Sequence, residues 1–275
     1  MNIIDVHTHI GRLHDSQYEK MTHEEIREAL LREMKKSGVA ASIVLPSYPR
    51  VGISVHTPLE RILSLTDGIP GLYPLGSIDI LSHTQKDVVR IEDLLKAKRI
   101  FGVKLYPGYQ HFYPSDKRCI PIYKICSRYR VPVVFHSGDT LGTSEERPHV
   151  KYAHPIHIDE VAVDFPDLTI VMAHLGNPWL VDAAEVIYKN KNVYADISGL
   201  VVGTSLKSPY GVLMKKRIEE LVAYAGGDKL LYGSDWPLAS MKEYIQFAKS
   251  LKISTKDRER MFAKNAMHIF KIPGL

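Results

Sequence analysis

Several features that would mark a specialised class of protein are scarce or absent in this sequence. It contains only two cysteines among 275 residues, too few for a disulfide framework. Its apolar runs are far shorter than the roughly 20 residues that a membrane-spanning helix needs. We find no signal-peptide pattern before the first apolar segment, no internal repeat and no low-complexity segment. We therefore expect a globular cytoplasmic protein that makes no contact with a membrane.

The two cysteines are Cys119 and Cys126, seven residues apart on one predicted helix. A helix rises 1.5 Å per residue, so their Cα atoms should lie roughly 10 Å apart, too far for a disulfide. We expect two free, buried thiols, which suits a reducing cytoplasm.

A strongly basic surface is also missing. The net charge is +5, from 36 Lys and Arg against 31 Asp and Glu, and the charges are spread along the chain. The short runs Lys35-Lys36 and Lys215-Lys216-Arg217 fall on predicted helices and are typical of solvated faces. Without a basic stripe or a nucleic-acid-binding motif, we expect a small-molecule substrate and no nucleic-acid partner. The oligomeric state is left open, a homo-oligomer included.

What the sequence does contain is a regular alternation of strand and helix patterns. Apolar, strand-like segments end near residues 9, 45, 78, 105, 136, 174, 197 and 234, a spacing of about 32 residues that matches one β-α unit. An open doubly wound sheet would carry Gly-x-Gly-x-x-Gly after its first strand, and none is present. The pattern predicts an α/β fold, a parallel eight-stranded (β/α)₈ TIM barrel, formed by residues 1–275 as a single domain.

Two local signals refine this prediction. Thr22-His-Glu-Glu25 has the pattern of a helix capping box, and Gly38 is a typical helix stop. The stretch from Ser137 to about Pro155 is the longest predicted loop, which makes it a candidate lid or specificity loop.

Polar residues stand where the predicted strands end. His7 and His9 close the first strand, and an i, i+2 pair on a strand projects both imidazoles toward one point. The other members of the set follow or interrupt later apolar runs: Lys104, His136, His174 and Asp235. Each one alone would more often be an ordinary hydrogen-bonded residue. The carboxyl ends of barrel strands meet at one face, so the six residues are expected to converge there.

The chemistry of this set is that of a divalent metal site. Three imidazoles and one carboxylate, from His7, His9, His136 and Asp235, would hold Zn²⁺ or a similar ion and leave room for water or substrate. The ion would lower the pKa of its water and polarise a carbonyl oxygen. His174 could then act as a general acid or base, and Asp235 could accept the proton from the water.

Lys104 has three interpretations that the spacing alone leaves open. Its ammonium could pair with a substrate carboxylate. Its amine could carry CO₂ as a carbamate and, with His174, bind a second metal ion. It could also form only a structural salt bridge inside the barrel mouth.

Five segments together resemble the amidohydrolase superfamily. They are Asp-Val-His-Thr-His-Ile-Gly, Gly-Val-Lys-Leu-Tyr-Pro, Val-Val-Phe-His-Ser-Gly, Val-Met-Ala-His-Leu-Gly and Leu-Tyr-Gly-Ser-Asp-Trp-Pro, in this order over nearly the whole chain. The similarity is strongest to the amidohydrolase-related branch, which includes decarboxylases, lactonases and other hydrolases. The resemblance implies a metal-binding barrel with His7, His9, His136 and Asp235 on one ion, commonly zinc, and His174 as the catalytic histidine. It favours one tight metal ion, with a second one left open.

The resemblance identifies the substrate poorly. We expect a hydrolase that opens an ester, lactone or amide bond of a small, carboxylated molecule, because the chain is compact. The alternative is a metal-dependent decarboxylase (a carboxy-lyase) of an aromatic or unsaturated acid, and a catalytically inactive binding module is a third hypothesis. Residues after strand ends are candidates to line the substrate pocket: Arg12, Tyr106, His111, Trp179 and Trp236, with Tyr48 and Arg50 as further ones.

Overall fold

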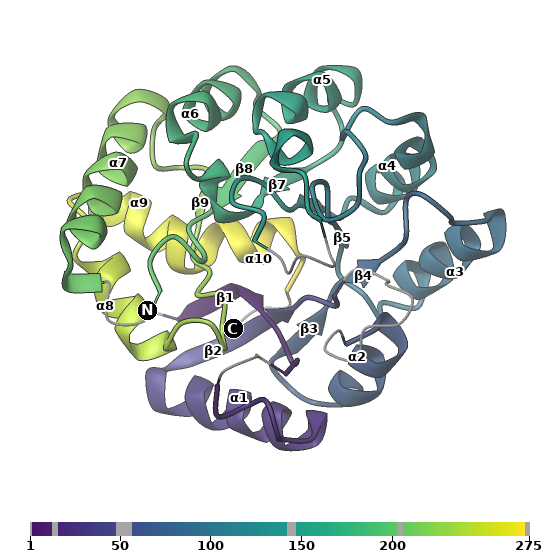
Figure 1. Ribbon diagram of the computed structural model, residues 1–275, viewed down its shortest axis with the longest axis horizontal. Coiled ribbons are helices and arrows are strands. Elements are labelled where there is room, and N and C mark those ends of the chain that lie inside the picture. The colour runs from purple at the N-terminus through teal and green to yellow at the C-terminus, as the bar shows by residue number, and fades with distance from the viewer. Residues whose placement is uncertain (1, 13–15, 48–56, 142–146, 203–205, 273–275) are drawn as a thin grey trace.

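The computed structural model describes residues 2–12, 16–47, 57–141, 147–202 and 206–272. Strands lie at the centre and helices surround them, and the chain runs once around this ring in order (Figure 1). The strands are β1 (Ile3–Thr8), β2 (Val39–Val44), β3 (Leu72–Pro74), β4 (Gly76–Ser77), β5 (Val103–Leu105), β6 (Val133–Phe135), β7 (Ile170–Met172), β8 (Val193–Asp196) and β9 (Leu230–Leu231).

The strands are all parallel and follow one another in chain order. One sheet has the order β1-β2-β3 and the other runs from β4 to β9 without a crossover. β3 and β4 are two halves of the single strand predicted to end near residue 78, since β3 pairs with β2 and β4 pairs with β5. With these halves counted together, the described residues contain eight strands, as the sequence predicted.

The first and last strands also meet. The backbone N–H of Val6 donates to Tyr232 O (2.9 Å), that of Asp235 to His7 O (2.9 Å) and that of His9 to Trp236 O (2.8 Å). A parallel bridge links Thr8 to Trp236. We call this junction the β1–β9 seam. It joins the two free edges of the sheet, so the architecture is the (β/α)₈ barrel expected from the spacing.

Helices alternate with the strands on the outside of the ring: α1 (His23–Ser37), α2 (Leu59–Thr66), α3 (Gln85–Lys96), α4 (Ile120–Tyr129), α5 (Ile156–Asp164), α6 (Leu180–Lys189), α7 (Pro209–Ala225) and α8 (Met241–Lys249). The chain ends in α9 (Thr255–Glu259), a π-helical turn and α10 (Asn265–Ile269). Among the residues described, no helix is both long and apolar enough to cross a bilayer.

The predicted helix signals at the start and end of α1 are confirmed. The Thr22 hydroxyl accepts from Glu25 N (3.2 Å), and the Glu25 carboxylate accepts from Thr22 N (2.7 Å). Gly38 takes the left-handed conformation (φ 71°) and its N–H bonds back to Met34 O, the geometry that favours glycine after a helix.

Two apolar clusters form the core. The larger one fills the layer between strands and helices, with side chains such as Ile26, Leu30 and Phe135. The smaller one joins Val134 and Val171 to residues of the C-terminal segment such as Phe270. Cys119 and Cys126 are free and buried, as predicted.

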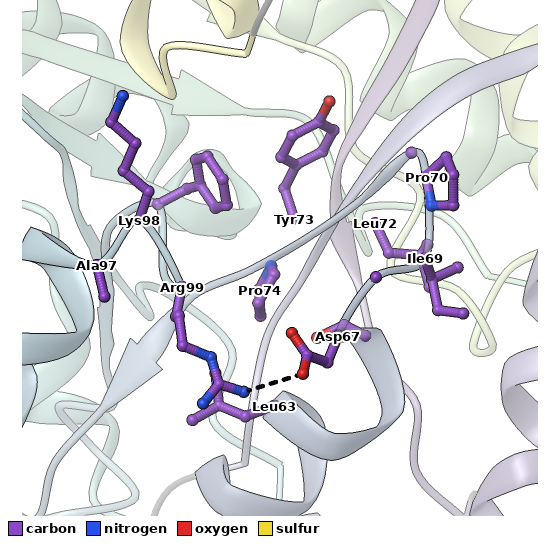
Figure 2. Close-up of a pocket in the computed structure, with 14 residues that line it drawn as sticks. Leu63, Asp67, Ile69, Pro70, Leu72, Tyr73, Pro74, Ala97, Lys98 and Arg99 are labelled. Atoms are coloured by element: carbon purple, nitrogen blue, oxygen red, sulfur yellow. Dashed lines mark ion pairs between the residues drawn. The ribbon is translucent and has the colours of Figure 1, made fainter.

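A cavity of about 410 Å³ lies among the segments that lead into β3 and β5, at the amino ends of these strands. Figure 2 shows Arg99 and Asp67 facing each other across part of it, with their ion pair at 3.7 Å. It is lined by none of the six residues that the sequence assigned to the site, which fits a barrel in which that face serves stability.

Candidate active site

A second cavity, of about 450 Å³, lies at the carboxyl ends of the strands. All six residues from the predicted strand ends line it: His7, His9, Lys104, His136, His174 and Asp235. They come from β1, β5 and the segments that directly follow β1, β6, β7 and β9. The expected convergence on one face is therefore present.

Three of these side chains form a compact donor set. One ligand atom each of His7, His9 and Asp235 lies within 4.8 Å of the others. The carboxylate Oδ1 of Asp235 is 3.3 Å from His9 Nε2 and 3.7 Å from His7 Nε2. This set spans the β1–β9 seam, since both histidines belong to the first strand and the aspartate follows the last.

The protonation states of His7 and Asp235 suit a metal ligand sphere. Burial lowers the pKa of His7 to about 4, so its imidazole is neutral at physiological pH. Burial raises the pKa of Asp235, but the nearby His7 and the hydrogen bond from His9 outweigh it and hold that pKa well below its usual range. Neutral imidazoles and an ionised carboxylate are the forms that bind a divalent ion.

Asp235 and His174 share an unusual backbone conformation. Both have positive φ, 64° for Asp235 and 57° for His174, a region that non-glycine residues rarely adopt. Gly199 lies against both side chains, and a Cβ atom there would come within 2.8 Å of Asp235 Oδ2 and 3.0 Å of His174 Nδ1. Strained residues of this kind concentrate at functional sites.

His136 lies in the cavity but outside the compact donor set. Its ring centroid is 5.1 Å from that of His174, and its Nε2 donates to the carbonyl oxygen of Asp139 at 3.0 Å. Burial lowers its pKa well below the ordinary value. In this arrangement only Nδ1 is free as a ligand atom, so its role as the third imidazole on the ion stays a prediction.

Lys104 is completely buried, and its Nζ has no hydrogen-bond partner in the described part of the chain. It lies 5.0 Å from the centre of the Tyr106 ring. Burial lowers the pKa of its amine to about 8. An unpartnered buried amine is costly, this one lines the cavity, and no described residue forms a salt bridge with it.

His174 is connected to a buried polar pair that the sequence reasoning missed. Its backbone N–H donates to Asp196 Oδ1 (3.0 Å), and its Nδ1 lies 2.9 Å from Ser198 Oγ and 3.2 Å from Ser198 O. Asp196 Oδ2 is also 3.0 Å from His7 Nδ1. Asp196 ends the apolar strand β8, the same signal that identified Lys104, but the prediction assigned no site residue to this strand.

The substrate candidates are distributed differently from the expectation. Tyr106 lines the cavity and its hydroxyl donates to Pro46 O. The cavity lining also includes Tyr109, Asp139 and Asn177, which follow strand ends by a few residues and were not singled out. The Asn177 amide donates to Asp139 Oδ2 at 2.7 Å.

The other four candidates do not line this cavity. Arg12 donates to Met21 O, His111 bonds to Arg147 O, the Trp179 ring lies 4.5 Å from that of His154, and Trp236 is buried against Tyr18. Their role in substrate binding stays a prediction. Tyr48, Arg50 and part of the candidate lid lie outside the described residues.

Comparison with known proteins agrees with this geometry. The sequence profile of the amidohydrolase family matches residues 4–272. Among curated proteins, none matches the chain. An uncharacterised TIM-barrel protein from Bordetella bronchiseptica has a similar structure, with a TM-score of 0.75, 22% identity, and coverage of 98% of this chain and 99% of the other.

Two further similar structures differ in the reaction that they are named for. One is a probable 2-pyrone-4,6-dicarboxylic acid hydrolase from Acinetobacter baumannii with citric acid bound (TM-score 0.68, 14% identity, coverage 99% and 100%). The other is 5-carboxyvanillate decarboxylase from Sphingomonas paucimobilis (TM-score 0.70, 14% identity, coverage 98% and 99%). At this identity they show the fold alone. The family profile spans both ends of the barrel seam and all six converging residues, so the chain belongs to the amidohydrolase family.

Proposed function

We propose that this chain is a metal-dependent hydrolase that opens an ester, lactone or amide bond of a small carboxylated molecule. The observation that carries the proposal is the convergence of His7, His9 and Asp235 within 4.8 Å at the carboxyl face of the barrel. Two imidazoles and a carboxylate fit zinc or a similar divalent ion, and enzymes of this family are metal-dependent. Zinc is bound in a similarly folded amidohydrolase from Burkholderia multivorans.

Each residue then has a defined task. His7, His9 and Asp235 would hold the ion, with His136 as a further ligand through its free nitrogen. A bound ion would supply Lewis-acid polarisation of a substrate oxygen and would lower the pKa of water. Asp235, ionised and beside both histidines, accepts a proton, and His174, which follows β7, takes up a proton on its free ring nitrogen and passes it to the leaving group.

Lys104 supports a carboxylated substrate. Its buried Nζ has no hydrogen-bond partner among the described residues, and Lys104 lines the same cavity as the donor set. A substrate carboxylate would satisfy this cation at short range, in surroundings where such a pair is strong. The alternative is that this amine carries CO₂ as a carbamate and binds a second metal ion. Native mass spectrometry of the purified protein distinguishes the two, because a carbamate adds the mass of one CO₂.

A second candidate reaction is metal-dependent decarboxylation, which the similarity to 5-carboxyvanillate decarboxylase favours. Its requirements are the same site and a substrate carboxylate beside Lys104. Incubation in ¹⁸O-labelled water with carboxylated lactones and carboxylated phenols separates the reactions. Incorporation of ¹⁸O into the product supports hydrolysis, and CO₂ release without incorporation supports decarboxylation.

The site itself is tested with Asp235→Asn. We expect a loss of kcat of about 10²- to 10⁴-fold, the contribution that a general base typically makes, together with weaker metal retention and an unchanged circular dichroism spectrum. Asp159→Asn is the matched control, because Asp159 is on α5 and pairs with Lys189 at 2.7 Å, away from the cavity. Near-normal turnover of Asp235→Asn would contradict the proposal.

A further inference from the structure

The buried Asp196 carboxylate contacts two of the histidines in the site, His7 and His174. It is fully buried. Its Oδ1 accepts the backbone N–H groups of His174 and Ser198, each at 3.0 Å, and also the Ser198 hydroxyl. Its Oδ2 lies 3.0 Å from His7 Nδ1. The carboxylate therefore has partners on both oxygens.

A hydrogen count fixes the proton on each ring. An ionised carboxylate only accepts, so His7 Nδ1 must carry the hydrogen that points at Asp196. A carbonyl oxygen only accepts, so His174 Nδ1 must carry the hydrogen that points at Ser198 O (3.2 Å). The Ser198 hydroxyl donates its hydrogen to Asp196. Its oxygen can then only accept from the Nδ1–H groups of His174 (2.9 Å) and His7 (3.0 Å).

This arrangement leaves one nitrogen of each ring unprotonated, and in both rings it is Nε2. His7 Nε2 lies 3.7 Å from Asp235 Oδ1. His136 has the opposite arrangement, because its Nε2 donates to Asp139 O. The tautomers at this site thus differ from ring to ring and follow from fixed acceptors.

We propose that Asp196 and Ser198 are positioning residues that hold His7 and His174 in the Nδ1–H tautomer. They present one Nε2 lone pair to the metal ion and the other to the substrate. Ser198 links the two rings, so the ligand histidine and the acid–base histidine share one hydrogen-bond network. The predicted effect on ion affinity rests on the proposed metal-dependent function, whereas the predicted tautomers are independent of it.

Asp196→Asn provides a sharp test. Two backbone N–H groups point at the Oδ1 position, so the amide oxygen of the variant must stay there. Its NH₂ group then occupies the Oδ2 position and points at His7 Nδ1, which has to become an acceptor. The substitution is therefore expected to move the His7 proton to Nε2, the atom that should bind the ion.

The measurement is long-range ¹H–¹⁵N correlation of the imidazoles in the metal-free, full-length protein at about pH 8, where free histidine is neutral. The signals are assigned with His7→Gln and His174→Gln. The wild type should show protonated Nδ1 in both rings, and Asp196→Asn should show protonated Nε2 in His7. Zinc titration should show about a 10- to 100-fold weaker affinity for Asp196→Asn, the usual effect of losing such a partner.

Ser198→Ala retains the carboxylate and serves if Asp196→Asn does not fold. It should keep the Nδ1–H form of His7, shift the His174 Nδ1 resonance and weaken zinc binding less than Asp196→Asn. The matched control is Ser42→Ala, at a buried serine of β2 whose hydroxyl has no partner in the described residues. It should change neither the histidine resonances nor the zinc affinity.

Protonated Nε2 on His7 or His174 in the wild type would overturn the inference, as would an unchanged His7 tautomer in folded Asp196→Asn. An unchanged His174 Nδ1 resonance in Ser198→Ala would do the same. If the tautomers are as expected and no divalent ion binds, the proposed metal-dependent function fails while the positioning role stands.

Discussion

At the scale of single residues, Lys104 is the place where function conflicts with stability. Its amine is fully buried and has no hydrogen-bond partner in the part of the chain that the structure describes, which costs free energy in the folded state. Its two neighbours in β5, Val103 and Leu105, pack in the apolar core. We infer that the cost is tolerated because the amine acts on the substrate.

We predict that Lys104→Met raises the stability of the metal-free protein while it abolishes binding of carboxylated ligands. The pKa of Lys104 is lowered to about 8 in the folded state from its usual 10.5. The buried charge therefore destabilises the folded protein fully below about pH 8. This destabilisation decreases as the pH rises from about 8, where the folded state loses the proton, to about 10.5, where the unfolded chain loses it too. The gain should be on the order of a few kcal/mol at pH 7 and shrink at alkaline pH.

Thermal denaturation at several pH values checks this prediction, with the exposed Lys98→Met as the control. A lower melting temperature for Lys104→Met at pH 7 would mean that the amine is stabilised in the native state, by Asp196 and Asp235 acting at a distance.

The two cysteines should be inert in the native protein. Burial raises the pKa of Cys119 to about 12 and that of Cys126 further, so almost no thiolate exists at about pH 8. We expect a negligible reaction with a chromogenic disulfide reagent in native buffer, and reaction of both thiols in denaturant. Rapid modification of either thiol in the folded protein would contradict the buried position.

At the scale of elements, local signals decided where helices begin. The Thr22–Glu25 capping box starts α1, and both of its reciprocal hydrogen bonds are present. Thr22→Ala removes one of them and should cost about 1 kcal/mol, which lowers the melting temperature of a protein of this size by about 2–4 °C. Thr22→Ser keeps the hydroxyl and should behave like the wild type. Equal melting temperatures for Thr22→Ala and Thr22→Ser would show that the cap adds nothing.

The alternation of apolar segments predicted the order and parallel arrangement of the strands, but not their lengths. The strand predicted to end near residue 234 pairs with β8 only at Leu230 and Leu231, and the residues after it meet β1 through the separate hydrogen bonds of the seam. The strand predicted to end near residue 174 pairs only from Ile170 to Met172. The periodicity of apolar residues predicts which residues are buried. Where a strand ends depends instead on backbone conformations, such as the positive φ of Asp235, that this periodicity does not reveal.

The same reasoning explains which site residues were found. Side chains on or directly after strands inherit their direction from the barrel, so His7, Lys104 and His174 lie where expected. Arg12, His111 and Trp179 sit farther along loops, where direction depends on local contacts such as the bond of His111 to Arg147 O. No property of these residues in the sequence gives that information.

At the scale of the whole molecule, the donor set joins the first strand of the ring to the last. An ion held by His7, His9 and Asp235 would cross-link the β1–β9 seam from both sides. Ligands that bind only the folded state stabilise it, by about 2.7 kcal/mol at a concentration of 100 times Kd. We therefore predict that chelation lowers the melting temperature and that zinc restores it.

Hydrogen exchange locates this effect. Amides at the seam, such as those of Val6, His9 and Asp235, should lose protection on chelation more than amides of α3 or α4. His7→Ala should show no melting shift with zinc. A uniform change over the whole chain, or a shift that persists in His7→Ala, would place the ion elsewhere.

The seam also sets when the proposed metal site can form during synthesis. Ser234 donates its backbone N–H to Asp5 Oδ1 across 229 positions of the sequence, so two segments that are synthesised far apart in time meet there. Until the later segment emerges, β1 has an open edge and His7 and His9 lack their aspartate. A chain that has not yet made the segment after β9 therefore lacks the complete donor set, and the proposed metal site exists only in the closed ring.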